Sequence, residues 1–184
     1  MKFKSVMVVG AALLCGACNN SDVERTASRA PDAPVQAQPS VAGVAGKVLE
    51  IQVGQSSSES ILLGAGGVLE TSIKSPGAGD AIGIGVQIGN FAGASDGEIE
   101  MSACVEQTCA SGRSKLEGTQ DNSFVDVTLS TPVPLRDGDK LKVKIGKVGG
   151  TKDVAIWMYN VETETLAPDG AQRPGAPKLR ITLR

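Results

Sequence analysis

The sequence contains no histidine among its 184 residues, and aromatic residues make up only 3% of it. Histidine is the commonest general base and the commonest metal ligand, so a catalytic site or a metal site in this chain would have to use other residues. No apolar run approaches the roughly 20 residues that a transmembrane helix needs. Basic residues are not in excess, with 18 Lys and Arg against 20 Asp and Glu. This balance gives no support to nucleic-acid binding.

The amino terminus has the order of a bacterial secretory signal. Lys2 and Lys4 precede a short apolar run at 6–14, and small residues then lead to a cysteine. Gly16-Ala17-Cys18 resembles the lipobox of bacterial lipoproteins, in which a signal peptidase cuts before the cysteine and its thiol carries a diacylglycerol. Cys15 stands where that family usually has leucine. The resemblance implies a signal peptide at 1–17 and a lipid anchor on Cys18.

Plain secretion with cleavage after Ala17 is the alternative, but it leaves Cys18 as an unpaired thiol in an oxidising compartment. With lipid on Cys18 and Cys15 removed, Cys104 and Cys109 remain as a pair. Asn19 follows the cysteine, where lipoproteins kept in the inner membrane tend to have aspartate. The resemblance therefore implies the outer membrane, on either the periplasmic or the cell-surface side.

Residues 18–45 are predicted to be a flexible linker. They are rich in Ala, Ser, Pro, Gln and Val, and prolines at 31, 34 and 39 interrupt any helix. This composition cannot offset the entropy of ordering. Loss of Lys2 and Lys4 with the signal leaves 16 basic against 20 acidic residues, a net charge of −4. Residues 46–184 remain for one folded domain.

That domain shows the period-2 alternation of β-strands. Eight or nine short segments are separated by turn residues, and none of the intervening stretches has the pattern of an amphipathic helix. The segments are 48–53, 61–63, 68–73, 82–88, 99–105, 125–130, 141–145, 154–159 and 179–183. One apolar and one polar face per strand is typical of antiparallel sheets packed face to face. We therefore predict an all-β, antiparallel β-sandwich of jelly-roll type.

Cys104 and Cys109 flank four residues, a loop length suited to a β-hairpin. Cysteines that face each other across a hairpin lie within the distance that a disulfide tolerates. We predict a structural disulfide, because the spacing is not that of a C-x-x-C redox motif and no second Cys or His pair completes a zinc site.

Two sets of residues are candidates for ligand binding. Trp157 and Tyr159 share one face of a strand, as in a stacking platform for sugars, although core packing is the simpler interpretation. Lysines alternate along another strand at Lys140, Lys142 and Lys144, with Arg136, Lys147 and Lys152 nearby. These basic residues could bind phosphate or uronate groups of a ligand. Alternatively, they form a solvent-exposed strand face, or a strand edge whose charges prevent aggregation.

Acidic residues cluster at Asp96-Gly97-Glu98, at Asp121 and at Asp137-Gly138-Asp139. Asp-Gly pairs between strands are ordinary turn chemistry, which is the interpretation that we favour. A Ca²⁺ site at Asp137 and Asp139 is the alternative, and a glycosidase acid/base pair is a further one. We expect no other metal site and no cofactor.

The order of features from about 48 to 159 resembles β-sandwich modules found with bacterial glycosyltransferases and surface-polysaccharide proteins. The matching stretches are 79–84, 94–100, 121–127 and 134–145. The resemblance implies a β-sandwich in a carbohydrate-rich setting. It identifies no ligand-binding residue in this chain.

We expect an envelope lipoprotein with a non-catalytic binding domain that contacts envelope glycans or a protein partner, with the membrane reached through the lipid anchor. The alternative is a periplasmic inhibitor, an immunity-type protein or an assembly lipoprotein. A weak glycan-active enzyme ranks third, because no nucleophile–base pair can be assembled.

Overall fold

The computed structural model describes residues 46–184, and these residues form eleven β-strands without an α-helix. In chain order the strands are β1 (Lys47–Glu50), β2 (Ser57–Leu63), β3 (Val68–Lys74), β4 (Gly79–Gly89), β5 (Glu98–Val105), β6 (Thr108–Lys115), β7 (Phe124–Leu135), β8 (Lys140–Val148), β9 (Val154–Leu166), β10 (Gln172–Pro177) and β11 (Leu179–Leu183). Residues 1–45, which include Cys15, Cys18 and the predicted linker, lie outside the described part.

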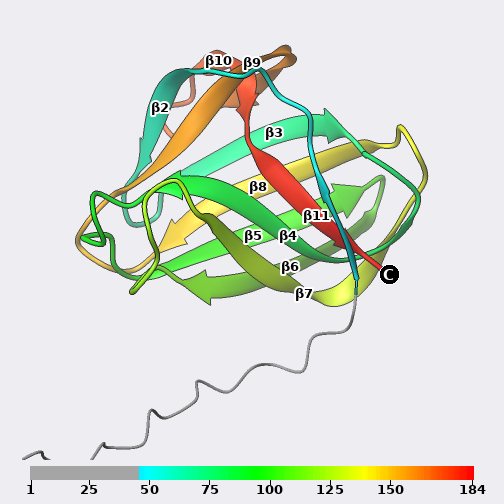
Figure 1. The fold of residues 1–184 in the computed structure, drawn as a ribbon, viewed down its shortest axis with the longest axis horizontal. Coiled ribbons are helices and arrows are strands. Elements are labelled where there is room, and N and C mark those ends of the chain that lie inside the picture. The colour runs from blue at the N-terminus through cyan, green and yellow to red at the C-terminus, as the bar shows by residue number, and fades with distance from the viewer. Residues whose placement is uncertain (1–45) are drawn as a thin grey trace, which may run out of the picture. The chain divides into compact units, whose positions relative to one another are not determined.

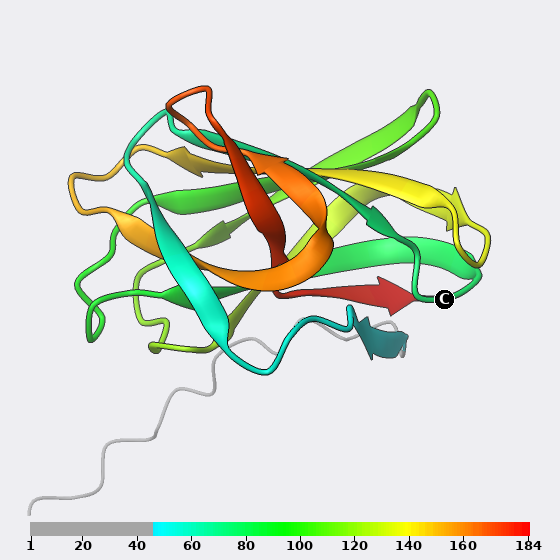
Figure 2. The same ribbon diagram turned by 90° about the horizontal axis from the view of Figure 1, so that it is seen from above.

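Every pairing between these strands is antiparallel, so the all-β, antiparallel prediction is confirmed. β1, β11, β4 and β7 pair among themselves, and the other seven strands form a second group. The end of β4 joins the two groups, since Ile88 and Gly89 pair with Ile156 and Ala155 of β9. All strands therefore belong to one folded sheet, in which β4, β7 and β11 lie over β3, β8 and β5 (Figures 1 and 2).

Alternation along the strands places apolar side chains in one core. On β8, Leu141, Val143 and Ile145 are fully buried, whereas the lysines between them are exposed. The same alternation buries one face of β3, β5 and β7. Burial of a side chain of this size contributes about 1.5–3 kcal/mol, so this repeated pattern supplies the main stabilisation of the domain.

The predicted disulfide is present in the β5–β6 hairpin. Cys104 and Cys109 are directly opposite each other in the ladder, and their Cα atoms are 4.1 Å apart. This short separation is typical of a non-hydrogen-bonded antiparallel pair, where side chains approach most closely. Because the closed loop is so short, the bond is expected to contribute only about 2 kcal/mol.

Candidate functional site

The site is created by a break in the pairing of β9. Its partner β10 pairs with it up to Pro174 opposite Glu164, and pairing resumes at Ala176 opposite Tyr159. The four β9 residues at 160–163 therefore have no strand partner in the described chain. A bulge of this kind bends the strand and re-aims its side chains. Here it moves β9 away from its neighbours and leaves space beside β3.

β3 contributes the opposite wall, because it stays paired with β8 while it separates from β9. Pairing with β9 is confined to Glu70 and Thr71, whereas pairing with β8 continues to Lys74 opposite Lys140. The Ser75 amide and carbonyl bond on the β8 side, to Asp139 and Gly138. Because such groups alternate along a strand, the N–H and C=O of Lys74 point to the opposite side, toward the open space.

A third wall comes from the connection between β1 and β2. The predicted strand at 48–53 ends at Glu50, after which the Ile51 amide donates to the Leu179 carbonyl at 2.8 Å and the chain leaves the ladder. Ile51, Gln52 and Val53 then line the same hollow as residues 161–163 of β9. The three walls enclose a groove of about 680 Å³, a volume within the usual range of ligand sites.

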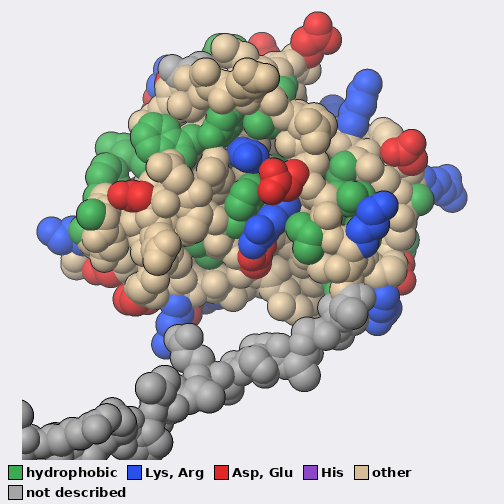
Figure 3. All heavy atoms as spheres, in the orientation of Figure 1, with side chains coloured by type: hydrophobic (Ala, Val, Ile, Leu, Met, Phe, Trp, Pro, Cys, Tyr) green, Lys and Arg blue, Asp and Glu red, His purple; other side chains and the backbone are tan. Residues whose placement is uncertain are grey.

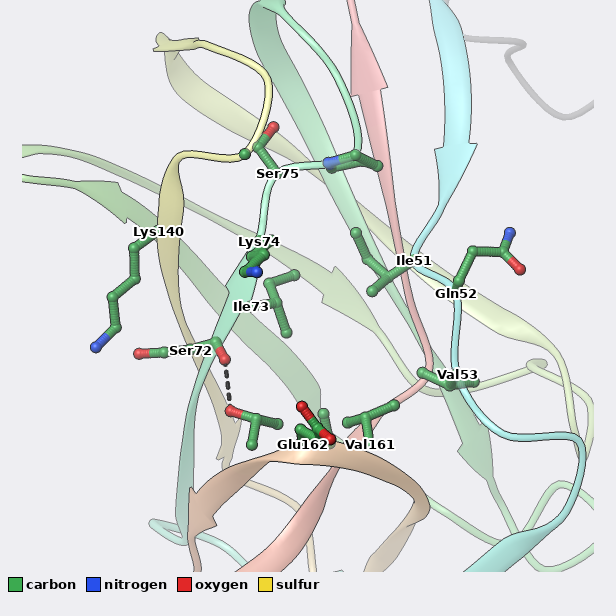
Figure 4. A pocket seen from close by; sticks show the side chains of 14 residues that line it. Ile51, Gln52, Val53, Ser72, Ile73, Lys74, Ser75, Lys140, Val161 and Glu162 are labelled. Atoms are coloured by element: carbon green, nitrogen blue, oxygen red, sulfur yellow. Dashed lines mark hydrogen bonds between the residues drawn. The ribbon is translucent and has the colours of Figure 1, made fainter.

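We call this space the β3 groove. Its residues come from the connector, β3, β9 and adjoining turns. They are Ile51, Gln52, Val53, Ser72, Ile73, Lys74, Ser75, Pro76, Gly138, Lys140, Val161, Glu162, Thr163 and Ala176. Figure 4 shows Ile51, Ile73 and Val161 around its interior, and a hydrogen bond of 2.8 Å from Thr163 Oγ1 to the Ser72 carbonyl ties β9 to β3 at one end.

Positive charge gathers at the rim of the groove. Lys74 and Lys140 stand opposite each other on β3 and β8, a like-charge pair that costs stability. Lys142 follows on the same face, and within residues 46–184 none of these three lysines has a salt-bridge partner. Lys144 is different, because its Nζ lies 2.6 Å from Glu70 Oε1. Lys74 and Lys140 therefore border the β3 groove, which Glu162 also lines, whereas Lys142 borders a neighbouring hollow with Glu70 and Lys144.

The predicted lysine row thus exists on β8 at Lys140, Lys142 and Lys144, but Lys147 does not extend it. The odd-numbered positions of β8 face the core, and Lys147 is buried there. Its Nζ donates to the Gly149 carbonyl at 2.6 Å and lies 3.8 Å from Asp96 Oδ1. Lys147 therefore holds the β8–β9 turn together and is unavailable to a ligand.

Trp157 and Tyr159 share the outward face of β9 as expected, and both are half-buried. The Trp157 indole packs closely over Gly89, and the Tyr159 hydroxyl donates to Gln87 Oε1 at 2.8 Å. Tyr159 borders a polar hollow of about 260 Å³, whereas Lys140 borders the β3 groove. Tyr159 and Lys140 therefore border different hollows, and Trp157 lines neither of them.

The acidic clusters make hydrogen bonds within turns. Asp139 Oδ2 accepts from the Arg136 amide at 2.8 Å, next to Gly138, whose φ is +78°. Asp137, the other calcium candidate, is exposed in the same turn. Across residues 46–184, no three His, Cys, Asp or Glu side chains lie close enough together to hold a metal ion.

Asp96 is the most heavily bonded of these carboxylates. Its oxygens accept from the Lys152 amide at 2.7 Å and from the Thr151 amide at 2.8 Å. These backbone hydrogen bonds stabilise the charged form and lower the pKa of Asp96 below its ordinary value. A group of this kind stabilises the fold above its unfolded-state pKa of about 3.9, and loses that contribution as pH falls through its lower folded-state value.

We therefore expect Asp96→Asn to reduce thermal stability at neutral pH and to make little difference at pH values below the lowered folded-state pKa of Asp96, where this carboxyl is protonated in both states. Thermal unfolding of the two proteins across this range measures the effect. Glu117 and Asp169 also have lowered pKa values, because the amides of Glu117 itself and of Ala171 donate to them. Because Glu117 and Asp169 are present in both proteins, their contributions cancel when the stability of the variant is subtracted from that of the wild type. An Asp96→Asn deficit that is equal at every pH would contradict this account of the turn.

Sequence reasoning missed three parts of the groove: the connector at 51–53, Lys74, and the unpaired stretch of β9. The only signal for Lys74 was its position just before Ser75-Pro76-Gly77, where the strand ends.

No protein-family model matches the chain, and comparison with curated proteins gives no match. Among residues 46–184 there is no helix with the length and hydropathy to cross a membrane.

Proposed function

We propose that this protein is a non-catalytic binding lipoprotein of the bacterial outer membrane, tethered through Cys18, whose β3 groove binds an anionic envelope glycan. The observation that carries the proposal is the placement of Lys74 and Lys140 beside a hollow lined by apolar side chains such as Ile73 and Val161. The apolar face of a sugar ring can pack on Ile73 and Val161, while ammonium groups pair with uronate or phosphate groups.

The lysine arrangement supports a ligand more than a solvated strand face. An edge guarded against aggregation needs single charges, whereas here two cations face each other across neighbouring strands. Such a pair costs stability in the free protein, and an anion bound to both ammonium groups removes that cost. The main-chain N–H and C=O of Lys74 add a donor and an acceptor at the same point.

We also propose that residues 46–184 are a jelly-roll-like β-sandwich, related to the modules found with surface-polysaccharide proteins. The support is the arrangement of β4, β7 and β11 over β3, β8 and β5, with apolar faces turned toward a common core (Figure 2).

Binding of the full chain to polygalacturonate, a uronate polymer, tests the function, with neutral dextran as the comparison. We expect Lys74→Gln/Lys140→Gln to weaken binding about tenfold or more, since each charge-assisted contact contributes about 1.5–3 kcal/mol. Added salt should weaken wild-type binding in the same direction.

The matched control is Lys47→Gln/Lys115→Gln, which removes two exposed lysines from β1 and β6 and should leave binding unchanged. Equal losses in the two double variants would show that only overall charge matters. Binding of an envelope protein at the groove, with no affinity for any acidic glycan, would replace the ligand class by a protein partner.

A further inference from the structure

The connection that leaves β4 is held in an unfavourable backbone conformation. Phe91 and Ala92 have φ of +53° and +59°, in the left-handed region that suits glycine. One such residue with a bulky side chain is already unusual, and two in succession persist only where the surroundings impose them.

Hydrogen bonds from neighbouring elements impose this conformation. The carboxylate of Asp121 accepts from the Asn90 amide and, at 2.8 Å, from the Ala92 amide. Asn90 is fully buried; its side-chain amide donates to Thr119 and its Oδ1 accepts from the Gly93 amide at 2.9 Å. The tip of the connection is therefore rigid and not merely a loose loop.

The result is a fixed apolar tip. Phe91 is 53% exposed, and Ala92, Gly93 and Ala94 beside it are also exposed. None of the six residues at 90–95 carries a charge. We call residues 91–94 the apolar tip.

Apolar surface continues from the tip onto the adjoining strands. Trp157 packs over Gly89, two residues before Phe91, and Leu62 of β2 is 52% exposed opposite Ala155. Figure 3 shows hydrophobic side chains gathered at the upper left of its view, around β2 and the connection after β4. An exposed patch rooted in a rigid frame is the usual mark of a contact surface.

We propose that the apolar tip inserts Phe91 into the interface of the membrane that carries the lipid anchor. An aromatic side chain on an uncharged turn suits the headgroup level of a bilayer. This inference rests on the proposed tether. The predicted flexible linker of 28 residues, from Cys18 to residue 45, would keep the domain within about 25–30 Å of its anchor on average, a distance from which the tip reaches the same bilayer.

The tip and the β3 groove are separate features, made by different connections. Insertion of Phe91 would fix the orientation of the domain on the membrane and thereby the direction in which the groove opens. A tether alone leaves that orientation free.

Tryptophan fluorescence tests the contact, because Trp157 is the only tryptophan in the chain. In a Trp157→Phe background, Phe91→Trp places the reporter at the tip and Val48→Trp places it on β1, where Val48 is also exposed. The full lipidated chains are reconstituted into phosphatidylcholine vesicles with and without brominated lipid. We expect brominated lipid to reduce the emission of the tip reporter about twofold or more, and that of the β1 reporter far less.

Ala94→Trp in the same background is a second tip reporter that avoids the left-handed positions, for use if Phe91→Trp does not fold. Equal emission with both lipids at the tip, or equal quenching of tip and β1 reporters, would overturn the insertion while leaving the tether intact. Failure of the lipidated chain to enter vesicles at all would overturn the tether and the insertion together.

Discussion

Cys18→Ser is expected to remove the protein from the outer-membrane fraction almost completely. The predicted modification attaches acyl chains at this one thiol, and membrane anchoring of this kind depends on the buried hydrocarbon. Without the thiol, the lipoprotein signal peptidase also lacks its substrate, so the chain should accumulate as a precursor that is 17 residues longer. Cell fractionation with mass spectrometry of the amino terminus measures both effects.

Cys15→Ser is the matched control. Cys15 lies within the predicted signal peptide, so this variant should be cleaved, lipidated and sorted as the wild type is. A Cys18→Ser protein that still matures and still sediments with membranes would contradict the tether, and so would a mature wild-type mass without acyl chains.

Gly175→Ala is expected to cost at least about 2 kcal/mol of unfolding free energy, the largest stability effect of a single methyl group that we predict. Gly175 lies at the register jump between β10 and β9, with φ of +95°. A Cβ there would overlap the carbonyl oxygen of Tyr159. Because that jump separates β9 from β3, any folded variant should also lose ligand binding at the groove.

Gly170→Ala separates the cost of the left-handed backbone conformation from the cost of the overlap with Tyr159. Gly170 has a similar φ of +80°, but a Cβ there meets no atom within 4 Å. Gly170→Ala should therefore lower the unfolding free energy only by the cost of placing alanine in the left-handed conformation, about 1–2 kcal/mol. Urea unfolding of the two variants gives the comparison. Equal losses would show that the contact with Tyr159 does not hold the bulge.

Strands with clean alternation were predictable because burial selects one face at every second residue. The lysines and apolar residues of β8 are the clearest example, and the hairpin disulfide followed from the spacing and the count of the cysteines together with the expected oxidising compartment. β10 was not predictable, since Pro174, Gly175 and Pro177 have the composition of a turn. It forms a strand because pairing with the long β9 outweighs local preference.

The groove was hidden from sequence reasoning for a related reason. It depends on where β9 stops pairing, which is set by contacts between residues far apart in the chain, such as Gly175 with Tyr159. Periodicity describes each strand by itself. Proximity in sequence grouped Lys147 with its basic neighbours, although its odd-numbered position on the inner face of β8 gives it a structural role beside Asp96.

Amide chemical-shift mapping on the full chain with oligogalacturonate shows where on the domain the ligand binds. We expect the largest shifts on Ile51–Val53, on Ile73 and Lys74, and on 161–163, the three walls of the β3 groove. Shifts concentrated instead on Trp157 and Tyr159, with the groove unchanged, would contradict this expectation.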